Sequence, residues 1–256
     1  MGSNYRCAQR VVVWLGPNSE RSDVAITFLQ DIGSTVPETS YSSSQNTIGK
    51  SDFGRISPGT KYRLPKADAI QWSGLRELIR CRWFARLWIV YEVFLNDNVI
   101  VQCGNTTFPW SDIENFSHQV MNSSFLMRLM REEQHNENPY IHEGTSAYLL
   151  ASSITEYRKQ NERDRVLDWV MAAFAVQTAS DPRDYIYALL CLVSPAEASL
   201  IEPIYRAPVA DVFTHFTRTI IDKQGRWGFL HRVQWTGSSD MGLPSWVVTR
   251  DALRGG

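Results

Sequence analysis

The stretch that most constrains the fold runs from residue 80 to residue 105, RCRWFARLWIVYEVFLNDNVIVQCGN. Its first part predicts a helix, because large apolar side chains recur there at helical spacing. They define one buried face: Phe84, Leu87, Trp88, Tyr91 and Leu95. Its second part, Val99 to Cys103, is a short apolar run of the kind that forms a buried strand. A helix that leads directly into such a strand indicates an α/β fold.

Glu92 lies one turn beyond Trp88, at the edge of the apolar face of this predicted helix. A carboxylate in that position has either a structural partner or a chemical role. The structural alternative is an ion pair with Arg86 or Arg183, which would hold two layers of the fold together. The chemical alternative is catalysis, because a partly apolar helix face shifts the pKa of an acid. The residues alone leave both alternatives open.

The composition excludes several classes of protein. A chain of 256 residues with 43% hydrophobic and 21% charged residues is ordinary for a globular protein. Its formal net charge of −1 offers no electrostatic argument for nucleic acid or an anionic membrane as partner. No segment reaches about 18 consecutive apolar residues, and the N-terminus lacks the apolar stretch of a signal peptide. We therefore expect a cytoplasmic protein without a membrane segment.

The cysteines and histidines predict neither disulfides nor a metal site. Four cysteines are widely separated along the chain: Cys7, Cys81, Cys103 and Cys191. They form no CxxC pair, and the five histidines show no metal-ligand spacing. Free thiols in a reducing compartment are the expectation, with no metal and no cofactor.

The N-terminal half predicts half of a βαβ unit followed by an insertion. The run from Arg10 to Leu15 is rich in β-branched residues and closes on Gly16-Pro17, which indicates a strand buried on both faces. A helix from Ser22 to Gly33 follows. Residues 34–66 are rich in Ser, Thr, Gly and Pro and predict a long surface loop, with a lid as the alternative. A helix from about Ala67 to Ile79 then leads into the stretch at residue 80.

From Ser111 onward the pattern becomes mostly helical. Residues Glu162 to Thr178 predict an amphipathic helix that turns Trp169 inward. The Asp-Pro-Arg-Asp sequence at 181–184 predicts the start of another helix that extends to Val193, with Asp181 as its N-cap. A last helix is expected to begin at Pro208.

These elements predict a three-layer α/β domain with a small sheet flanked by helices. The sheet contains Val11–Leu15 and Val99–Cys103, and a mostly helical C-terminal half packs against it. The predicted organisation is an α/β region at 1–110, with the loop insertion at 34–66, and a helical remainder at 111–256.

Three stretches, together with the end of the chain, match the motifs of one protein family. The similar family patterns are "IY..A..V.VWLG", "WF.R.W..QE" and "A.DPRD.IYALLGL". The matching stretches are Tyr5-Arg-Cys-Ala8 with Val11-Val-Val-Trp-Leu-Gly16, then Trp83-Phe-Ala-Arg86-Leu-Trp88-Ile-Val-Tyr-Glu92, then Ala179-Ser-Asp181-Pro-Arg183-Asp184-Tyr-Ile-Tyr187-Ala-Leu-Leu190. The closing Leu243-Pro-Ser-Trp246-Val is similar to the family's "LPSWVPDW". The matches keep their order and extend across most of the chain, so the sequence specifically resembles the fungal heterokaryon-incompatibility (HET) domain family.

Five residues of these motifs are interpreted as structural: Trp83, Arg86, Asp181, Arg183 and Asp184. The sequence departs from the family pattern at Tyr91, where Gln is usual, and at Cys191, where Gly is usual. The family's upstream "SYTWG" and "WIDAICINQ" segments are not found. The chain thus resembles an N-terminally shortened HET protein, either a fragment, a partial gene model or a decayed copy.

The resemblance implies a role in fungal non-self recognition and programmed cell death, through association with protein partners or with itself. HET domains in turn remotely resemble TIR domains, which have a flavodoxin-like α/β fold. NAD-cleaving TIR domains carry their catalytic acid after a Trp-to-Glu helix signature, with a strand soon after. This implies an alternative function as a NAD glycohydrolase that uses Glu92, with NAD as substrate. A third alternative is an inactive fragment.

Two further parts of the sequence supply candidate ligand-binding residues. Trp88 belongs to the predicted core, with stacking against a base as the alternative. The strand-to-helix loop with Gly16, Asn18 and Ser19 is able to present backbone N–H groups to a phosphate, with a tight turn and a helix cap as the structural alternative.

Overall fold

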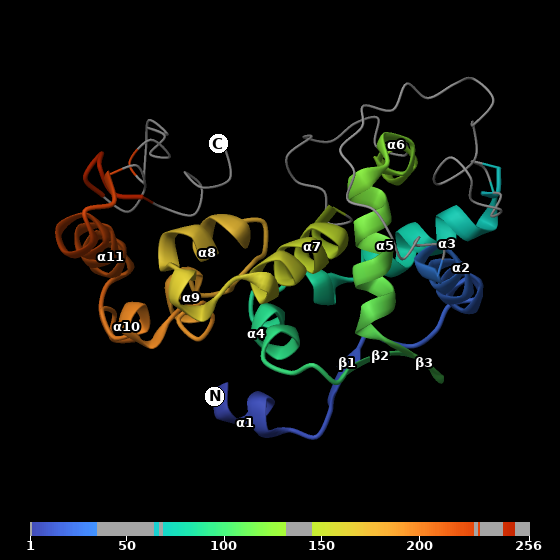
Figure 1. Ribbon diagram of the computed structural model, residues 1–256, viewed down its shortest axis with the longest axis horizontal. Helices are drawn as coiled ribbons and strands as arrows, with labels where there is room; N and C mark the ends of the chain where they lie inside the picture. Colours follow the sequence, from blue (N-terminus) through green and yellow to red (C-terminus); the bar gives the residue numbers. More distant parts are fainter. Residues whose placement is uncertain are drawn as a thin grey trace. The chain divides into compact units, whose positions relative to one another are not determined.

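The computed structural model describes residues 2–34, 64–66, 69–131, 145–227, 230 and 243–248 (Figure 1). Most of the predicted loop at 34–66 lies outside the described residues. The chain divides into two compact units. Unit 1 comprises Met1–Ala8, Ala85–Asp97 and Ser153–Gly256, and unit 2 comprises Gln9–Phe84 and Asn98–Ser152. The predicted division after residue 110 stays a prediction.

Unit 2 holds the sheet and the helices that cover it. Its strands are β1 (Val11–Trp14), β2 (Val99–Cys103) and β3 (Thr106–Pro109). Its helices are α2 (Ser22–Ser34), α3 (Ile70–Ile79), α5 (Trp110–Asn122), α6 (Ser124–Arg131) and the first half of α7 (Thr145–Lys159). The 3-10 turn η2 (Arg82–Ala85) closes the first part of this unit.

The prediction that one small sheet contains the strands at residues 11 and 99 is confirmed, and the structure pairs these two strands directly. Among the described residues it has three strands in the order β1-β2-β3. The first two are parallel, with Val11 beside Val99 and Val13 beside Val101. The strand β3 returns antiparallel to β2. A parallel pair separated by helices requires a crossover connection, so this half is an α/β arrangement.

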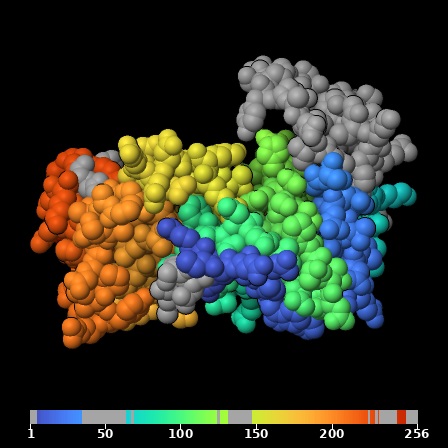
Figure 2. Space-filling view, turned by 60° about the horizontal axis from the view of Figure 1, so that its bottom comes forward, coloured from blue at the N-terminus to red at the C-terminus, as the bar shows by residue number. Residues whose placement is uncertain are grey.

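The strand β1 is buried on one face only, which corrects the prediction of a strand buried on both faces. Val11 and Val13 are buried, whereas Val12 is 54% and Trp14 is 52% exposed. Figure 2 shows dark-blue atoms from the N-terminal part of the chain, to which β1 belongs, at the surface. The apolar run alone could not reveal this, because a strand with one covered face and a fully buried strand share the same β-branched residues.

The hairpin between β2 and β3 depends on a glycine. Gly104 has a φ of +55°, a left-handed conformation that side chains with a Cβ rarely adopt. A Cβ at this position would also lie 2.7 Å from Asn18 Oδ1. The Gly104 N–H donates to Gly16 O at 2.8 Å, so the hairpin is tied to the loop after β1.

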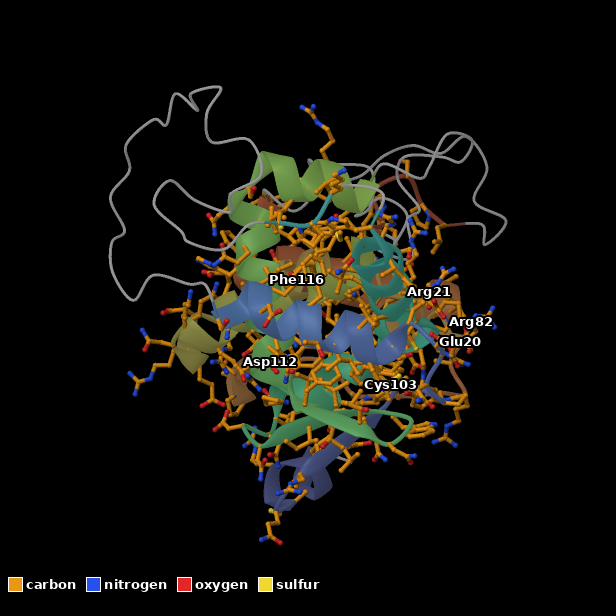
Figure 3. The ribbon with its side chains drawn as sticks, turned by 90° about the vertical axis from the view of Figure 1, so that its right-hand side faces the viewer. Glu20, Arg21, Arg82, Cys103, Asp112 and Phe116 are labelled. Carbon is orange, nitrogen blue, oxygen red and sulfur yellow. The ribbon has the colours of Figure 1, made fainter. Side chains whose placement is uncertain are left out.

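Helices form the core of unit 2 above the inner face of the sheet (Figure 3). The helix α5 packs against β2 and β3, and α2 packs against both α3 and α5. Phe28 of α2 meets Trp72 of α3 edge to face, with ring centroids 4.7 Å apart. Phe116 of α5 and Cys103 of β2 lie inside, whereas Arg82 lies at the surface.

Unit 1 is helical in its described residues. Its helices are α1 (Gly2–Cys7), α4 (Ile89–Phe94), the second half of α7, α8 (Leu167–Ala173), α9 (Asp184–Tyr187), α10 (Pro195–Ala198) and α11 (Val209–Gln224), with the 3-10 turn η3 (Glu162–Asp164). The mixed α/β class with a helical C-terminal half is therefore confirmed. Its likeness to TIR or flavodoxin folds stays a prediction.

The helix predicted from residue 80 to residue 95 is wrong, because the chain breaks between η2 and α4. Leu87 N–H donates to Thr178 O at 2.8 Å, and Thr178 N–H donates to Ala85 O at 2.6 Å. These contacts replace the helical hydrogen bonds of that turn. They also rotate the face that is buried, so that Ile89 and Val93 are inside whereas the predicted core residues Trp88, Tyr91 and Leu95 are half-buried.

The single helix predicted over residues 162–178 is also wrong. Val166 is extended, and α8 starts only after it. Arg165 instead caps the end of α7, with its guanidinium donating to Tyr157 O at 3.1 Å and to Gln160 O at 2.9 Å. Trp169, predicted to face inward, is 67% exposed. Trp169 was assigned to the inner face on the assumption of one continuous helix. Because α8 starts separately, a different set of its residues faces inward.

The last two predicted helices have different outcomes. The helix α9 ends at Tyr187 instead of Val193, and its N-cap is Arg183 instead of Asp181. The helix α11 starts after Pro208 as predicted, buries Phe213 and Phe216, and ends at Gly225, which has a φ of +61°.

Candidate functional site

Glu92 lies on α4 and is half-buried. Its carboxylate is hydrogen-bonded to the Tyr5 hydroxyl and lies close enough to Arg86 to interact with its charge. Burial raises the pKa of Glu92 above its usual value, and the favourable effects of Arg86 and Tyr5 offset this only in part. The environment therefore favours the protonated form of Glu92 more than water does.

Arg183, the other proposed partner of Glu92, pairs with Asp181 instead. Its Nη2 lies 2.6 Å from Asp181 Oδ2, and its Nε donates to Asp181 Oδ1 at 2.9 Å. The Arg183 backbone N–H also donates to Asp181 Oδ1, at 3.0 Å. These bonds hold the pKa of Asp181 below its usual value. The guanidinium further donates to Ala207 O at 2.9 Å, so it ties this turn to the loop before α11.

The carboxylate of Asp184 accepts hydrogen bonds from two aromatic side chains. The Trp88 indole Nε1–H donates to Asp184 Oδ2 at 3.1 Å, and the Tyr205 hydroxyl donates to Asp184 Oδ1 at 2.7 Å. Asp184 is only 8% exposed, so these two donors compensate for most of the lost hydration of its carboxylate. The ring of Tyr187 packs edge to face on that of Tyr205, with centroids 5.2 Å apart.

A pocket of about 340 Å³ lies between these two motif segments of unit 1. Residues from both segments line it: Arg86, Trp88, Thr178, Ala179, Ser180 and Asp184. Three of the residues selected from the sequence therefore meet in one place, namely Arg86, Trp88 and Asp184. Glu92 is not among the lining residues, so its carboxylate is beside this pocket's arginine but not in its wall.

The loop with Gly16, Asn18 and Ser19 lies in unit 2, and its polar groups are largely used within the loop itself. Ser19 N–H donates to Ser22 Oγ at 2.8 Å, and Ser22 N–H donates to Ser19 O at 3.1 Å. The Asn18 side chain lies against the hairpin at Gly104. These contacts fit a turn with a helix cap and leave few N–H groups for a phosphate.

Trp83, also in unit 2, is a core residue. Its ring packs against Phe84 at 5.3 Å and against Trp110 at 6.1 Å between centroids. It is 9% exposed, which fits the structural interpretation of its motif.

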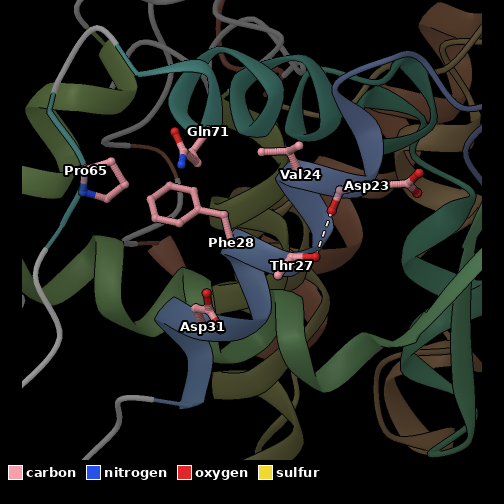
Figure 4. A pocket seen from close by; sticks show the side chains of 7 residues that line it. All are labelled: Asp23, Val24, Thr27, Phe28, Asp31, Pro65 and Gln71. Atoms are coloured by element: carbon pink, nitrogen blue, oxygen red, sulfur yellow. Dashed lines mark hydrogen bonds between the residues drawn. The ribbon is translucent and has the colours of Figure 1, made fainter.

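A second pocket of about 340 Å³ lies on α2 in unit 2 (Figure 4). Its lining includes Phe28 and two carboxylates, Asp23 and Asp31. Thr106 Oγ1 donates to Asp23 Oδ1 at 2.8 Å, and Thr27 Oγ1 donates to Asp23 O at 2.9 Å. These hydrogen bonds stabilise the helix α2, and they do not indicate a catalytic role for this pocket.

The sequence reasoning missed three residues of the site in unit 1. Tyr5 was quoted only as part of a motif, whereas its hydroxyl meets Glu92. Tyr205 and Thr178 were not selected, and they complete the surroundings of Asp184 and the pocket wall. Neither residue carries a local pattern, because both act through partners that are distant in the sequence.

Within the described ranges, no helix has the length and apolar character that crossing a membrane requires. A search of the same ranges finds no cluster of His, Cys, Asp and Glu side chains that would hold a metal ion. The described cysteines are free thiols, as Cys7, Cys81, Cys103 and Cys191 were predicted to be.

The fold thus defines a mixed α/β protein with a small sheet, a helical C-terminal half and a tryptophan tied to an Asp-Pro-Arg-Asp turn. The chain is similar to heterokaryon incompatibility protein 6, OR allele, of Neurospora crassa, with 24% identity over 287 aligned residues. The alignment covers 95% of this chain and 40% of that protein, so the chain spans well under half of the relative's length. No family model and no solved structure matches the chain.

This relative supports the resemblance to heterokaryon-incompatibility proteins over nearly the whole chain. The resemblance to TIR domains receives no support from the comparisons and stays a prediction.

Proposed function

We propose that this protein acts in heterokaryon incompatibility, as a component of fungal non-self recognition and cell-death signalling. The observation that carries the proposal is the similarity to a Neurospora heterokaryon incompatibility protein across 95% of the chain. The contact between Trp88 and Asp184 adds to it, because it joins two of the motifs on which the family resemblance rests. We further propose that the protein works by association with a protein partner or with itself.

The test is inducible expression of this chain in a filamentous fungus, with growth arrest and uptake of a vital dye as readouts. The wild-type chain is expected to arrest growth and admit the dye. A Trp88→Phe variant, which loses the hydrogen bond to Asp184, is expected to do so less, whereas Trp169→Phe at an exposed position is expected to match wild type. Normal growth with wild-type protein at confirmed expression would contradict the proposal and favour an inactive chain.

A second candidate function, NAD glycohydrolysis, rests on the surroundings of Glu92. Cleavage of the nicotinamide–ribose bond develops positive charge on the ribose, which a carboxylate stabilises. A half-buried acid with a raised pKa, beside a tyrosine hydroxyl and an arginine, is the kind of group that enzymes use.

The experiment is NAD turnover by concentrated protein, compared with Glu92→Gln and with the exposed control Glu202→Gln. The enzymatic function predicts turnover by wild type and by the Glu202 variant, and none by the Glu92 variant. If all three leave NAD intact while wild type still kills cells, association alone accounts for the function.

A further inference from the structure

The pocket of unit 1 that is lined by Arg86, Trp88 and Asp184 has been given no ligand by either proposed function. Its volume of about 340 Å³ is in the range of pockets that hold small molecules. It unites Arg86 of the Trp83–Glu92 motif with Asp184 of the Ala179–Leu190 motif, although Glu92 does not line it. A pocket built by two motifs that are far apart in the sequence is a candidate binding site in its own right.

The walls of this pocket are held together by hydrogen bonds to backbone carbonyl groups. Arg86 and Thr178 form a parallel β-bridge. Leu87 N–H donates to Thr178 O at 2.8 Å, and Thr178 Oγ1 donates to Ala85 O at 2.9 Å. The two segments are therefore fixed to each other before any ligand arrives, which lowers the ordering cost of binding.

The acids near the pocket are already supplied with donors. Asp184 accepts from Trp88 and Tyr205, one on each oxygen, and Asp181 accepts from Arg183. The exposed guanidinium of Arg86 is then the charged group of the wall that is available to a ligand. It interacts with Glu92, but a guanidinium has five N–H donors, so it can bind an anion as well.

The rest of the wall suits a flat ring beside that anion. The hydrogen bond to Asp184 fixes the orientation of the Trp88 indole, which lines the pocket. An indole ring stacks favourably on planar aromatic groups. The exposed hydroxyl of Ser180 adds a hydrogen-bond donor at the same opening, whereas the Thr178 hydroxyl already donates to Ala85 O.

We propose that this pocket binds a small organic anion in which a planar ring carries a carboxylate or a phosphate. Arg86 pairs with the anionic group, Ser180 donates to it, and Trp88 stacks on the ring. The site is independent of the proposed association and of any reaction at Glu92, so its failure would leave both of those proposals standing.

The test uses the full chain labelled with ¹⁵N and follows the indole N–H resonance of Trp88, assigned by its loss in Trp88→Phe. Two probes are titrated separately, adenosine monophosphate for the phosphate and indole-3-carboxylate for the carboxylate. A saturable shift with either probe is expected, and the probe that binds more tightly tells which anion the site prefers. Adenosine and indole, which lack the anion, are expected to bind at least about tenfold more weakly.

Variants locate the contact. Arg86→Gln is expected to weaken binding about tenfold or more, since it removes a charge-assisted contact. Arg82→Gln, at an exposed arginine outside the pocket, is the matched control and is expected to bind like wild type. Ser180→Ala, at an exposed position, supplies a second variant and is expected to weaken binding by about threefold.

Three results would overturn the proposal. The first is no shift of the Trp88 resonance with either probe at millimolar concentration. The second is equal binding by wild type, Arg86→Gln and Ser180→Ala. The third is an equal loss in Arg82→Gln and Arg86→Gln, which would indicate a diffuse electrostatic effect.

Discussion

The indole Nε1–H of Trp88 donates a hydrogen bond of 3.1 Å to Asp184 Oδ2, across 96 positions of the sequence. The bond joins the aromatic stretch around α4 to the Asp-Pro-Arg-Asp turn. Tyr205 donates to the other oxygen of the same carboxylate, so one buried acid holds three segments of unit 1 together.

Removal of the indole N–H should therefore destabilise unit 1. Trp88→Phe keeps an aromatic ring but deprives a nearly buried carboxylate of one donor, for an expected cost of about 1–3 kcal/mol in the free energy of unfolding. Urea denaturation followed by circular dichroism measures it. Trp169→Phe, at a ring that is 67% exposed, is expected to change stability by less than about 0.5 kcal/mol. Equal stability of the two variants would show that Asp184 does not depend on Trp88.

Glu92 should make stability depend on pH in an unusual direction for an acid. Burial raises its pKa in the folded protein above the usual 4.5, so the folded state binds the proton more tightly than the unfolded state does. The stabilising contribution of Glu92 is present at low pH and is lost as the pH rises through its folded pKa. Glu92→Gln cannot ionise, so its stability relative to wild type is expected to increase from acidic to neutral pH.

Thermal unfolding of both proteins at a series of pH values tests this prediction. Glu202→Gln, at an exposed glutamate of the same unit, is expected to show no comparable trend. A Glu92→Gln variant whose relative stability falls toward neutral pH would indicate that the pairing with Arg86 outweighs burial.

Arg226 should be one of the most sensitive charged residues of unit 1. Its Nη1 lies 3.0 Å from Asp168 Oδ1 and its Nη2 lies 2.9 Å from Glu197 Oε2, and both carboxylates are buried. Arg226→Met leaves two buried carboxylates without their cation, for an expected loss of about 3–5 kcal/mol. Chemical denaturation measures it, with Arg206→Met at an exposed position as the control.

A second variant separates charge from packing at this cluster. Arg226→Met combined with Asp168→Asn and Glu197→Gln removes all three charges and is expected to regain part of the loss. A combined variant less stable than Arg226→Met alone would show that the carboxylates stabilise the fold without the arginine.

The thiols should react at very different rates. Burial raises the pKa of Cys191 to about 12, whereas Cys7 is exposed. Because the thiolate is the reactive form, alkylation of Cys191 at pH 8 is expected to be more than about 100-fold slower than that of Cys7. Iodoacetamide labelling followed by peptide mass spectrometry measures both rates, and similar rates would contradict the raised pKa of the half-buried Cys191.

Neighbouring valines of β1 should differ in importance. Val13 is fully buried and Val12 is 54% exposed. Val13→Ala is expected to cost about 2 kcal/mol, because the lost methyl groups leave a cavity between the sheet and its helices. Val12→Ala is expected to cost less than about 0.5 kcal/mol. Equilibrium denaturation compares them, and a similar cost for both would mean that the outer face of β1 is also packed.

The candidate site shows how far local patterns reach. Spacing and motif matches selected Trp88, Arg86 and Asp184, which meet in one pocket. They did not reveal that the Trp88 indole donates to Asp184, or that the Tyr205 hydroxyl supplies the second donor to the same carboxylate. Such partnerships depend on contacts between segments that are distant in the sequence. A local pattern does not tell which distant segment packs against a given residue.

The chain's own residues determined the α/β class, the strands at 11 and 99, and the helix after Pro208, because hydrophobic periodicity and turn residues act locally. Tertiary structure decided where the stretch at residue 80 breaks and which of its faces is buried. There the backbone of Thr178 takes the hydrogen bonds that a continuous helix would have made. Packing decides between the helical hydrogen bonds and those with Thr178. The resulting break places Trp88 next to Asp184 and Glu92 beside Tyr5.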